Sequence, residues 1–480
     1  MKDARKFYID GGWVDPINGT DFEVINPSNE EAFAVISLGG EADTEAAIAA
    51  AKAAFPSWSS TSKEVRVALL EKLFDIYMRR SDEMGTIISE EMGAPISMSL
   101  VAQSGTGSGH IKALTRALKD FDFERELRAN TPNDRILYEP IGVCGLITPW
   151  NWPMNQIALK VVAALATGCT MVLKPSEISP LSATLFAEMI DEAGVPAGVF
   201  NLVNGDGPGV GTTLSGHPDV DMISFTGSTR AGILISKNAA DTVKRVSLEL
   251  GGKGANIIFA DADAKAVKHG IIRCFANSGQ SCNAPTRMLV ERSRYDEAVE
   301  EAKAAAEETS VDIASKKGRH LGPVVSQVQY DKIQTLIEKG INEGARLVAG
   351  GLARPEGLNR GYFVRPTVFA DCNNDMSIMR EEIFGPVIAL MPFDSEQEAI
   401  TIANDTVYGL TNYVQTSDGA KANRVARQLR SGMVDMNGMA RSSGSPFGGY
   451  KQSGNGREGG AWGLEEFLEI KAVGGWSPEE

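Results

Sequence analysis

From about residue 143 onward, short apolar runs alternate with longer stretches in which apolar side chains recur at helical spacing. Apolar runs joined by crossover helices are typical of parallel strands, because a parallel connection needs a dozen or more residues. The pattern therefore predicts a doubly wound α/β sheet. Its expected strands are Val143–Ile147, Thr170–Leu173, Val199–Val203 and Met222–Phe225, and its expected helices span 154–167, 181–193 and 229–238.

A second alternating set begins near Asn256–Phe259 and runs to about residue 445. Helices are expected at 294–308 and 327–343, and a strand at Val387–Met391. The chain has 480 residues, which is too long for one core, because single hydrophobic cores stop growing at ~250 to 300 residues. The sequence thus predicts two large α/β domains.

The segment before these sets is expected to be helical. Residues 44–55 follow Asp43, a candidate N-cap, and residues 64–92 carry apolar positions at helical spacing. Two further strands, Arg135–Glu139 and Glu465–Val473, have no obvious partner in either set. Because exposed edge strands are usually paired or covered, a partner subunit is the expected cover.

The composition is that of an ordinary globular protein, with 43% hydrophobic and 23% charged residues. The net charge of −15 would repel nucleic acid and anionic membranes, so neither is an expected partner. No apolar run reaches the length of a bilayer span, and residues 1–16 lack the apolar segment of a secretory signal. Five cysteines without CxxC spacing favour a reducing cytoplasm, and four scattered histidines argue against a metal site.

Three residues are candidates for chemistry. Cys282 follows a small, flexible Ser278-Gly279 turn in FANSGQSC, which suits an accessible thiolate nucleophile. Glu249 lies between apolar neighbours at the end of an expected strand, where its pKa could be raised for general-base work. The side-chain amide of Asn151 in PWNWP could donate to an oxyanion. Taken alone, each also fits a structural role: a buried cysteine, an exposed edge glutamate and a turn asparagine.

Two glycine-rich segments favour a phosphate-bearing ligand. GDGPGVG (205–211) and FTGST (225–229) both follow expected strands, and the second opens a helix whose amides can receive pyrophosphate. Neither has the GxGxxG spacing of the common dinucleotide motif. Lys174 and Glu177 follow another strand end, where an acid could accept a hydrogen bond from a ribose hydroxyl.

Together these residues resemble the aldehyde dehydrogenase superfamily over essentially the whole chain. The motifs appear in the family's order, and this combination is far more specific than any one of them. They are PWNWP, KPSE, FTGST, LELGGK, FANSGQSC, EEIFGPV (381–387) and PFGGYKQSGNGRE (446–458).

The resemblance implies a Rossmann-like NAD-binding domain (1–118 and 141–250), a catalytic domain (251–447) and bridging or oligomerisation segments (119–140 and 448–480). A homodimer or homotetramer is implied as well. The implied roles are Cys282 as nucleophile, Asn151 with the Cys282 backbone N–H as oxyanion hole, Glu249 as base for deacylation, Lys174 and Glu177 at the adenosine ribose, Gly207 near the adenine, Ser228 at the pyrophosphate, and Glu382 and Phe384 at the nicotinamide.

The implied reaction is oxidation of an aldehyde to a carboxylic acid with NAD, through a cysteine-bound thiohemiacetal and thioester. NAD is expected over NADP, because the carboxylate of Glu177 would repel a 2′-phosphate. One alternative is a CoA-acylating relative, which would not need Glu249. Two others are a cysteine hydrolase, which would need a histidine near Cys282, and a non-catalytic protein that kept the fold.

Several positions depart from the family pattern. Trp152 stands where many relatives have Phe. Asn155 and Gln156 make the helix after PWNWP polar for a wall of the substrate entrance, which predicts a polar aldehyde or semialdehyde as substrate. Further departures, for which the sequence indicates no role, are Gly254, Asn412 and Tyr413.

Overall fold

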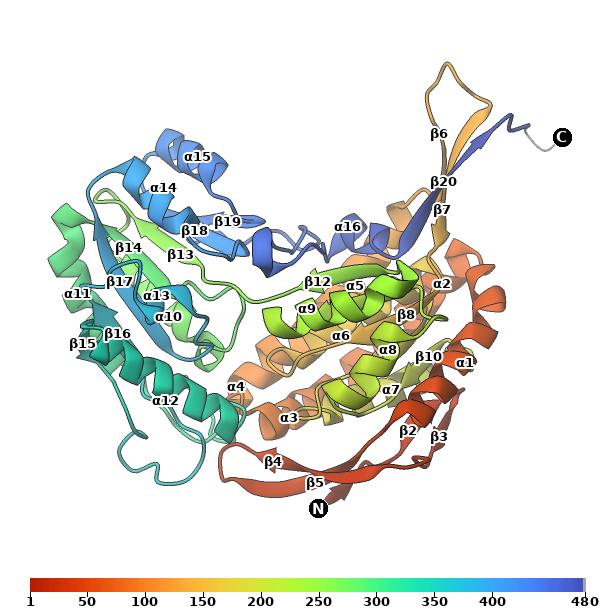
Figure 1. Ribbon diagram of the computed structural model, residues 1–480, viewed down its shortest axis with the longest axis horizontal. Coiled ribbons are helices and arrows are strands. Elements are labelled where there is room, and N and C mark those ends of the chain that lie inside the picture. Colours follow the sequence, from red (N-terminus) through yellow and green to blue (C-terminus); the bar gives the residue numbers. More distant parts are fainter. Residues whose placement is uncertain (478–480) are drawn as a thin grey trace.

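The computed structural model describes residues 1–477, and its first large sheet is the expected doubly wound one (Figure 1). Parallel strands run in the order β12-β11-β8-β9-β10, and two antiparallel strands, β2 and β3, continue the sheet beyond β10. The chain winds outward from β8 in both directions. The strands are β2 (Phe7–Ile9), β3 (Gly12–Val14), β8 (Val143–Ile147), β9 (Thr170–Lys174), β10 (Phe200–Leu202), β11 (Met222–Thr226) and β12 (Arg245–Glu249).

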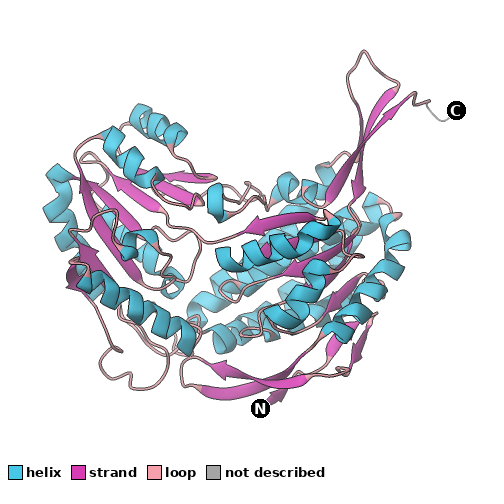
Figure 2. Cartoon of the chain, viewed as in Figure 1, coloured by secondary structure: helices cyan, strands magenta, loops and turns pink. Residues whose placement is uncertain are grey.

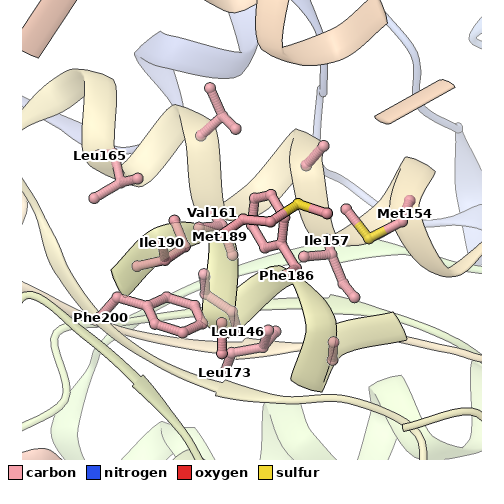
Figure 3. Packing of buried hydrophobic residues seen from close by; sticks show 14 of the residues in the cluster. Leu146, Met154, Ile157, Val161, Leu165, Leu173, Phe186, Met189, Ile190 and Phe200 are labelled. Carbon is pink, nitrogen blue, oxygen red and sulfur yellow. The ribbon is translucent and has the colours of Figure 1, made fainter. Parts of the chain in front are cut away.

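Helices cover both faces of this sheet, because successive strand residues point to opposite sides. On one face, Leu146 and Leu173 pack against Ile157 of α6 and Phe186 of α7 (Figure 3). On the other, Ile223 packs in a cluster with α1, α8 and α9. These helices are α1 (Glu41–Ser59), α6 (Pro153–Thr167), α7 (Leu181–Ala193), α8 (Thr212–Gly216) and α9 (Thr229–Ala239).

The second large sheet has the order β15-β16-β17-β14-β13-β18-β19 and is parallel except for β15. Helices α10 and α11 cover one face, and α12, α14 and α15 cover the other. The strands are β13 (Ala255–Ile258), β14 (Arg287–Glu291), β15 (Arg346–Ala349), β16 (Thr367–Ala370), β17 (Val387–Phe393), β18 (Thr411–Gln415) and β19 (Met433–Met436). The helices are α10 (Ala266–Phe275), α11 (Arg292–Glu307), α12 (Gln327–Asn342), α13 (Ser377–Arg380), α14 (Glu396–Asn404) and α15 (Gly419–Gln428).

Two small sheets complete the fold. The two strands that had no partner in the sequence pattern pair with each other as β7 (Asp134–Pro140) and β20 (Leu468–Gly474), and β6 (Glu124–Glu126) joins them. This sheet projects from the body beside the C-terminal end of the chain (Figure 2). The other has the order β1-β5-β4, with β1 (Lys2–Asp3), β4 (Thr20–Asn26) and β5 (Glu31–Leu38). The remaining helices are α2 (Lys63–Arg79), α3 (Ser81–Met92), α4 (Ile96–Met98), α5 (Ser104–Asp120) and α16 (Gly460–Glu465).

Two sequence-based expectations at element ends are wrong. Asp43 is not the N-cap of the first helix, because α1 begins at Glu41 and Gly40 is its N-cap. The Asp43 carboxylate instead accepts the backbone N–H of Gly40 at 3.1 Å and that of Ile17 at 2.8 Å from within the first turn. The last strand starts at Leu468 rather than at residue 465, because residues 460–465 form α16.

Among residues 1–477, no helix is both long enough and apolar enough to cross a membrane. A charged side chain lies at the centre of the second sheet. Arg287, fully buried at the start of β14, donates to the carbonyl oxygens of Lys253 at 2.9 Å, Ile402 at 3.0 Å and Ala403 at 2.9 Å. These bonds tie the LELGGK segment to the second domain.

Replacing Arg287 with Met should lower the apparent melting temperature by several degrees. The side chain is similar in length, but the three carbonyls lose their donors, at a cost of about 3 kcal/mol or more. Thermal scans at one fixed rate measure the change. Arg292→Met, which removes an exposed ion pair with Asp394, is the matched control. Equal melting temperatures in the two variants would contradict the role of Arg287.

Candidate active site

A cavity of about 210 Å³ lies where β8 and β11 end. Strand β9 lies on one side of β8 and β11 on the other, so the direction in which strands are added to the sheet reverses at β8. Open α/β sheets bind ligands at such a topological switch point. The first domain contributes Asn151, Gln156 and Ser228 to the lining. The second domain contributes Cys282, Gln329, Lys332, Glu382 and Phe384.

Five of the candidate residues named from the sequence therefore share one cavity: Asn151, Ser228, Cys282, Glu382 and Phe384. The others lie around it. Lys174 ends β9, Glu177 follows it, and Gly207 follows β10, so they lie farther along the same edge of the sheet. Glu249 ends β12 and is not part of the lining.

The loop that carries Cys282 has an unusual backbone held by side-chain amides. Asn277 and Ser278 both have a φ of 55°, a left-handed conformation that is uncommon for residues with a side chain. Asn277 Nδ2 donates to the carbonyl oxygen of Asn151 at 2.9 Å, and Gln103 Nε2 donates to that oxygen and to Asn277 Oδ1, both at 3.1 Å. Asn151 Nδ2 donates to the carbonyl of Gln280 at 3.1 Å. This buried network fixes Asn151 and the Cys282 loop relative to each other.

Glycines allow three backbone segments to meet at the cavity. A Cβ on Gly252 would lie 2.4 Å from the carbonyl oxygen of Cys282, and one on Gly251 would lie 2.4 Å from Glu382 Oε2. A Cβ on Gly279 would lie 2.0 Å from the carbonyl oxygen of Gly385. Larger side chains are therefore excluded in LELGGK and FANSGQSC by the neighbouring backbone and carboxylate.

Glu249 is buried next to an ion pair. Its two carboxyl oxygens have no hydrogen-bond partner among residues 1–477, and Oε1 would lie 2.7 Å from a Cβ on Gly448. Burial raises the pKa of Glu249 well above its ordinary value, and the charge of Glu458 raises it further, while Lys160 acts in the opposite sense. Lys160 and Glu458 form a buried ion pair. The protonated form of Glu249 is therefore favoured in this arrangement.

The thiol of Cys282 is also held neutral. Burial raises its pKa, and the negative charges of Glu382 and Glu458 raise it further. A hydrogen bond from the backbone of Asn283 lowers it only in part. A thiolate at Cys282 therefore needs a positive charge or a base to come close.

The edge of the first sheet forms a cradle for an extended, phosphate-bearing ligand. Ser228 is the N-cap of α9, and its Oγ accepts the N–H of Ala231 at 3.3 Å, which leaves other amides of the first turn free for an anion. Lys174 Nζ lies 3.3 Å from Glu177 Oε2, and burial lowers the pKa of Lys174. These groups lie at the ends of β11 and β9, on either side of β8, and this spread along the edge of the sheet fits a dinucleotide.

Glu382 and Phe384 form the opposite wall of this cradle. Glu382 Oε1 accepts the N–H of Gly252 at 2.8 Å. The Phe384 ring meets Trp150 edge to face, with centroids 5.4 Å apart, and its backbone has a φ of 59°. Gln329 Nε2 stabilises this turn by donating to the carbonyl of Phe384 at 2.9 Å.

Sequence reasoning missed Gln103, Gln329 and Lys332, because their helices carry no motif that marks them. Three residues that depart from the family pattern, Trp152, Asn412 and Tyr413, make structural hydrogen bonds near the site. Trp152 Nε1 donates to Ser281 Oγ at 2.8 Å, and Asn412 Oδ1 accepts the N–H of Ala255 at 2.9 Å. The hydroxyl of Tyr413 donates to the carbonyl of Asn283. Trp152 and Tyr413 thus brace the Cys282 loop from two sides, and Asn412 holds the start of β13.

All five cysteines are free. Within residues 1–477, no three His, Cys, Asp or Glu side chains are grouped closely enough to hold a metal ion.

Known proteins resemble this chain over its whole length. The aldehyde dehydrogenase family model matches residues 13–473. A 3-succinoylsemialdehyde-pyridine dehydrogenase from a Pseudomonas species is 55% identical over 478 residues, which cover 99% of each chain. An aldehyde dehydrogenase structure from Bartonella henselae is 60% identical, with a TM-score of 0.99 over 99% of this chain and 100% of that one. Aldehyde dehydrogenase C from Pseudomonas syringae, a cysteine-to-alanine variant with NAD⁺ and octanal, is 48% identical, with a TM-score of 0.97 over 99% and 98%.

The chain belongs to the aldehyde dehydrogenase family. The expected fold, with its Rossmann-like sheet, is confirmed. The expected reaction class, oxidation of an aldehyde with NAD as cofactor, is confirmed as well.

The neutral thiol generates a prediction for the enzyme without cofactor. Alkylation of Cys282 by iodoacetamide should be slow at neutral pH and should keep rising as pH passes 9.0, the ordinary thiol value, because the thiolate forms only above the raised pKa. Mass analysis of the modified peptide gives the rate, and Cys282→Ala corrects for the other thiols. A plateau in rate below pH 9 would show that the thiol is not held neutral.

Proposed function

We propose that Cys282 attacks the carbonyl carbon of an aldehyde bound beside Asn151. The observation that carries this proposal is a thiol and an amide donor from two different domains on one cavity at the switch point. The thiol first gives its proton to water. Attack by the thiolate then forms a C–S bond while the carbonyl π bond breaks, which leaves an oxyanion on the aldehyde oxygen. The second N–H of the Asn151 amide and the backbone N–H of Cys282 would hold that oxyanion, and comparable donors contribute about 3 kcal/mol each.

The residues of the cradle would hold NAD⁺ along the strand ends. When bound, this cofactor would supply a positive charge and a hydride acceptor for the thiohemiacetal carbon, and loss of the hydride would leave a thioester on Cys282. The proposed contacts are Lys174 and Glu177 with the adenosine ribose, Gly207 near the adenine, Ser228 with the pyrophosphate, and Glu382 and Phe384 with the nicotinamide ribose and ring.

Glu249 is the proposed base for the second half of the reaction. Its carboxyl would turn from the space beside Gly448 toward Cys282, ionise, and take a proton from water as the water oxygen attacks the thioester carbon. The C–S bond then breaks, the acid forms, and Cys282 leaves as a thiolate. The buried Lys160–Glu458 pair lies beside Glu249 and would balance its charge as it ionises.

The proposed substrate is an aldehyde with a second polar group. Gln156, a polar side chain in an otherwise largely apolar helix, lines the cavity of Cys282. The name of the Pseudomonas relative, a semialdehyde dehydrogenase of a succinoyl-pyridine, supports this class.

We further propose a cytoplasmic homodimer or homotetramer with the three-part domain division expected from the sequence. Free cysteines support a reducing compartment. Strand β20 is an edge of the small projecting sheet, and its Ile470 side chain is 67% exposed, which a second copy could cover.

Cys282→Ala should lose aldehyde oxidation by about a thousandfold or more, because no other thiol among residues 1–477 lines the cavity. The measurement is formation of reduced cofactor with an aldehyde panel and NAD⁺, with and without CoA. Cys372→Ala, a buried free thiol in the second domain, should keep full activity. Retained oxidation in Cys282→Ala, or a CoA ester as the main product of the wild type, would overturn the proposal.

The ratio of kcat/KM for NAD⁺ to that for NADP⁺ should be about tenfold or more in the wild type, because like charges that meet in a site are strongly unfavourable. Glu177→Gln should lower this ratio by weakening the repulsion of the 2′-phosphate. Glu188→Gln on α7, which alters a partly buried ion pair with Arg80, is the control. An unchanged ratio in Glu177→Gln would remove Glu177 from the ribose site.

A further inference from the structure

Tyr413 is a buried residue of β18 that contacts both ends of the loop carrying Cys282. Its hydroxyl donates to the carbonyl of Asn283, the residue directly after the nucleophile. Its ring lies against the guanidinium of Arg273, whose central carbon is 4.4 Å from the ring centroid. Arg273 belongs to the last turn of α10, which leads into the loop. One side chain thus closes the segment 273–283 at its base.

The far end of this segment is a tight turn. The N–H of Ala284 donates to the carbonyl of Ser281 at 3.0 Å. Cys282 and Asn283 are therefore the two central residues of a β-turn. The backbone N–H of Cys282, proposed above as half of the oxyanion hole, belongs to this turn. A donor on the Asn283 carbonyl limits how far the turn can rotate, and that N–H with it.

Arg273 is itself held in place by a buried carboxylate. Its Nη2 pairs with Oδ2 of Asp435 on β19, and Asp435 Oδ1 accepts the Nε–H of Arg441 at 2.9 Å. Each carboxylate oxygen therefore has a charged partner. Moving either arginine would leave a buried charge with fewer bonds, which is costly inside a protein. The guanidinium that contacts the Tyr413 ring is thereby fixed.

Gly254 makes room for this arrangement. A Cβ on Gly254 would lie 2.7 Å from the carbonyl oxygen of Thr411, 3.2 Å from that of Ala284 and 3.7 Å from Cε2 of Tyr413. A side chain there would push β18 and the end of the turn apart. Gly254 and Tyr413 both depart from the family pattern, and they lie next to each other, which indicates one local arrangement and not two unrelated changes.

We propose that Tyr413 is a positioning residue that keeps the backbone N–H of Cys282 directed at the oxyanion. This inference rests on the proposed function of Cys282. The hydroxyl acts on the turn through Asn283, and Arg273 keeps the ring in place. Burial raises the pKa of Tyr413, so its hydroxyl stays protonated and can donate.

Tyr413→Phe removes the hydroxyl and keeps the ring. The single-turnover rate constant for formation of reduced cofactor should fall about tenfold or more, because a small displacement of an oxyanion donor loses much of its effect. The KM for NAD⁺ and the rate of Cys282 alkylation by iodoacetamide at the same pH should each change less than about twofold, because neither depends on an oxyanion.

Tyr295→Phe is the matched control. This hydroxyl is also buried in the second domain and donates to a backbone carbonyl, that of Leu390, at 3.4 Å, but Tyr295 does not line the cavity. All three values should stay unchanged in this variant.

Arg273→Met tests the support of the ring. Alone, it should lower the single-turnover rate constant by less than Tyr413→Phe does. Added to Tyr413→Phe, it should cause no further fall, because it acts only through the hydroxyl. The rates are compared well below the melting temperature of each variant, which thermal scans measure.

An unchanged single-turnover rate in Tyr413→Phe or Arg273→Met would overturn the inference, as would the same loss in Tyr295→Phe. An equal fall in the alkylation rate would show a general loosening of the loop and would also overturn it. So would an effect confined to the KM for NAD⁺, or additive losses in the double variant. None of these outcomes affects the proposed function, which fails only if Cys282→Ala still oxidises aldehydes.

Discussion

The close backbone contacts at Gly252 and Gly279 set how two domains share one active site. At these positions the LELGGK segment, the Cys282 loop and the 382–385 loop approach each other to within distances that exclude any side chain. Because backbone contacts have little freedom to adjust, they place the thiol, the carboxylate of Glu382 and the ring of Phe384 on the end of the first sheet. A flexible side chain at this junction would leave the same groups present but misplaced.

Burial then decides the charge states of the groups brought together. Cys282 and Glu249 both lie in surroundings that disfavour their ionised forms, and the charge of Glu458 acts on both. In the proposed mechanism each must ionise at a different step, the thiol before attack and the carboxyl before hydrolysis. The resting site is thus unreactive by itself, and a bound cofactor and substrate would supply the charge and the proton acceptor.

The sequence predicted some long, periodic elements with their bounds and missed others, such as β4, β5 and α5. The strand at Val143–Ile147 and the helix at 181–193 were expected with their observed bounds. The spacing of apolar residues in these segments matches the faces that the strand and the helix bury. The first strands were missed, because β1 to β3 have only two or three residues and pair with distant segments. Candidate chemistry was found through motifs, whereas Gln103 acts through contacts 48 and 174 residues away, which no local pattern records.

The central claim is that a thioester forms on Cys282 and that Glu249 removes it. Incubating Glu249→Gln with NAD⁺ and a substrate aldehyde, followed by mass analysis of the Cys282 peptide, tests this claim most directly. The account predicts that the variant forms about one equivalent of reduced cofactor per site and retains the acyl group on Cys282, while the wild type turns over without accumulating it. Release of acid by Glu249→Gln at the wild-type rate, or an acyl group on another residue, would contradict it.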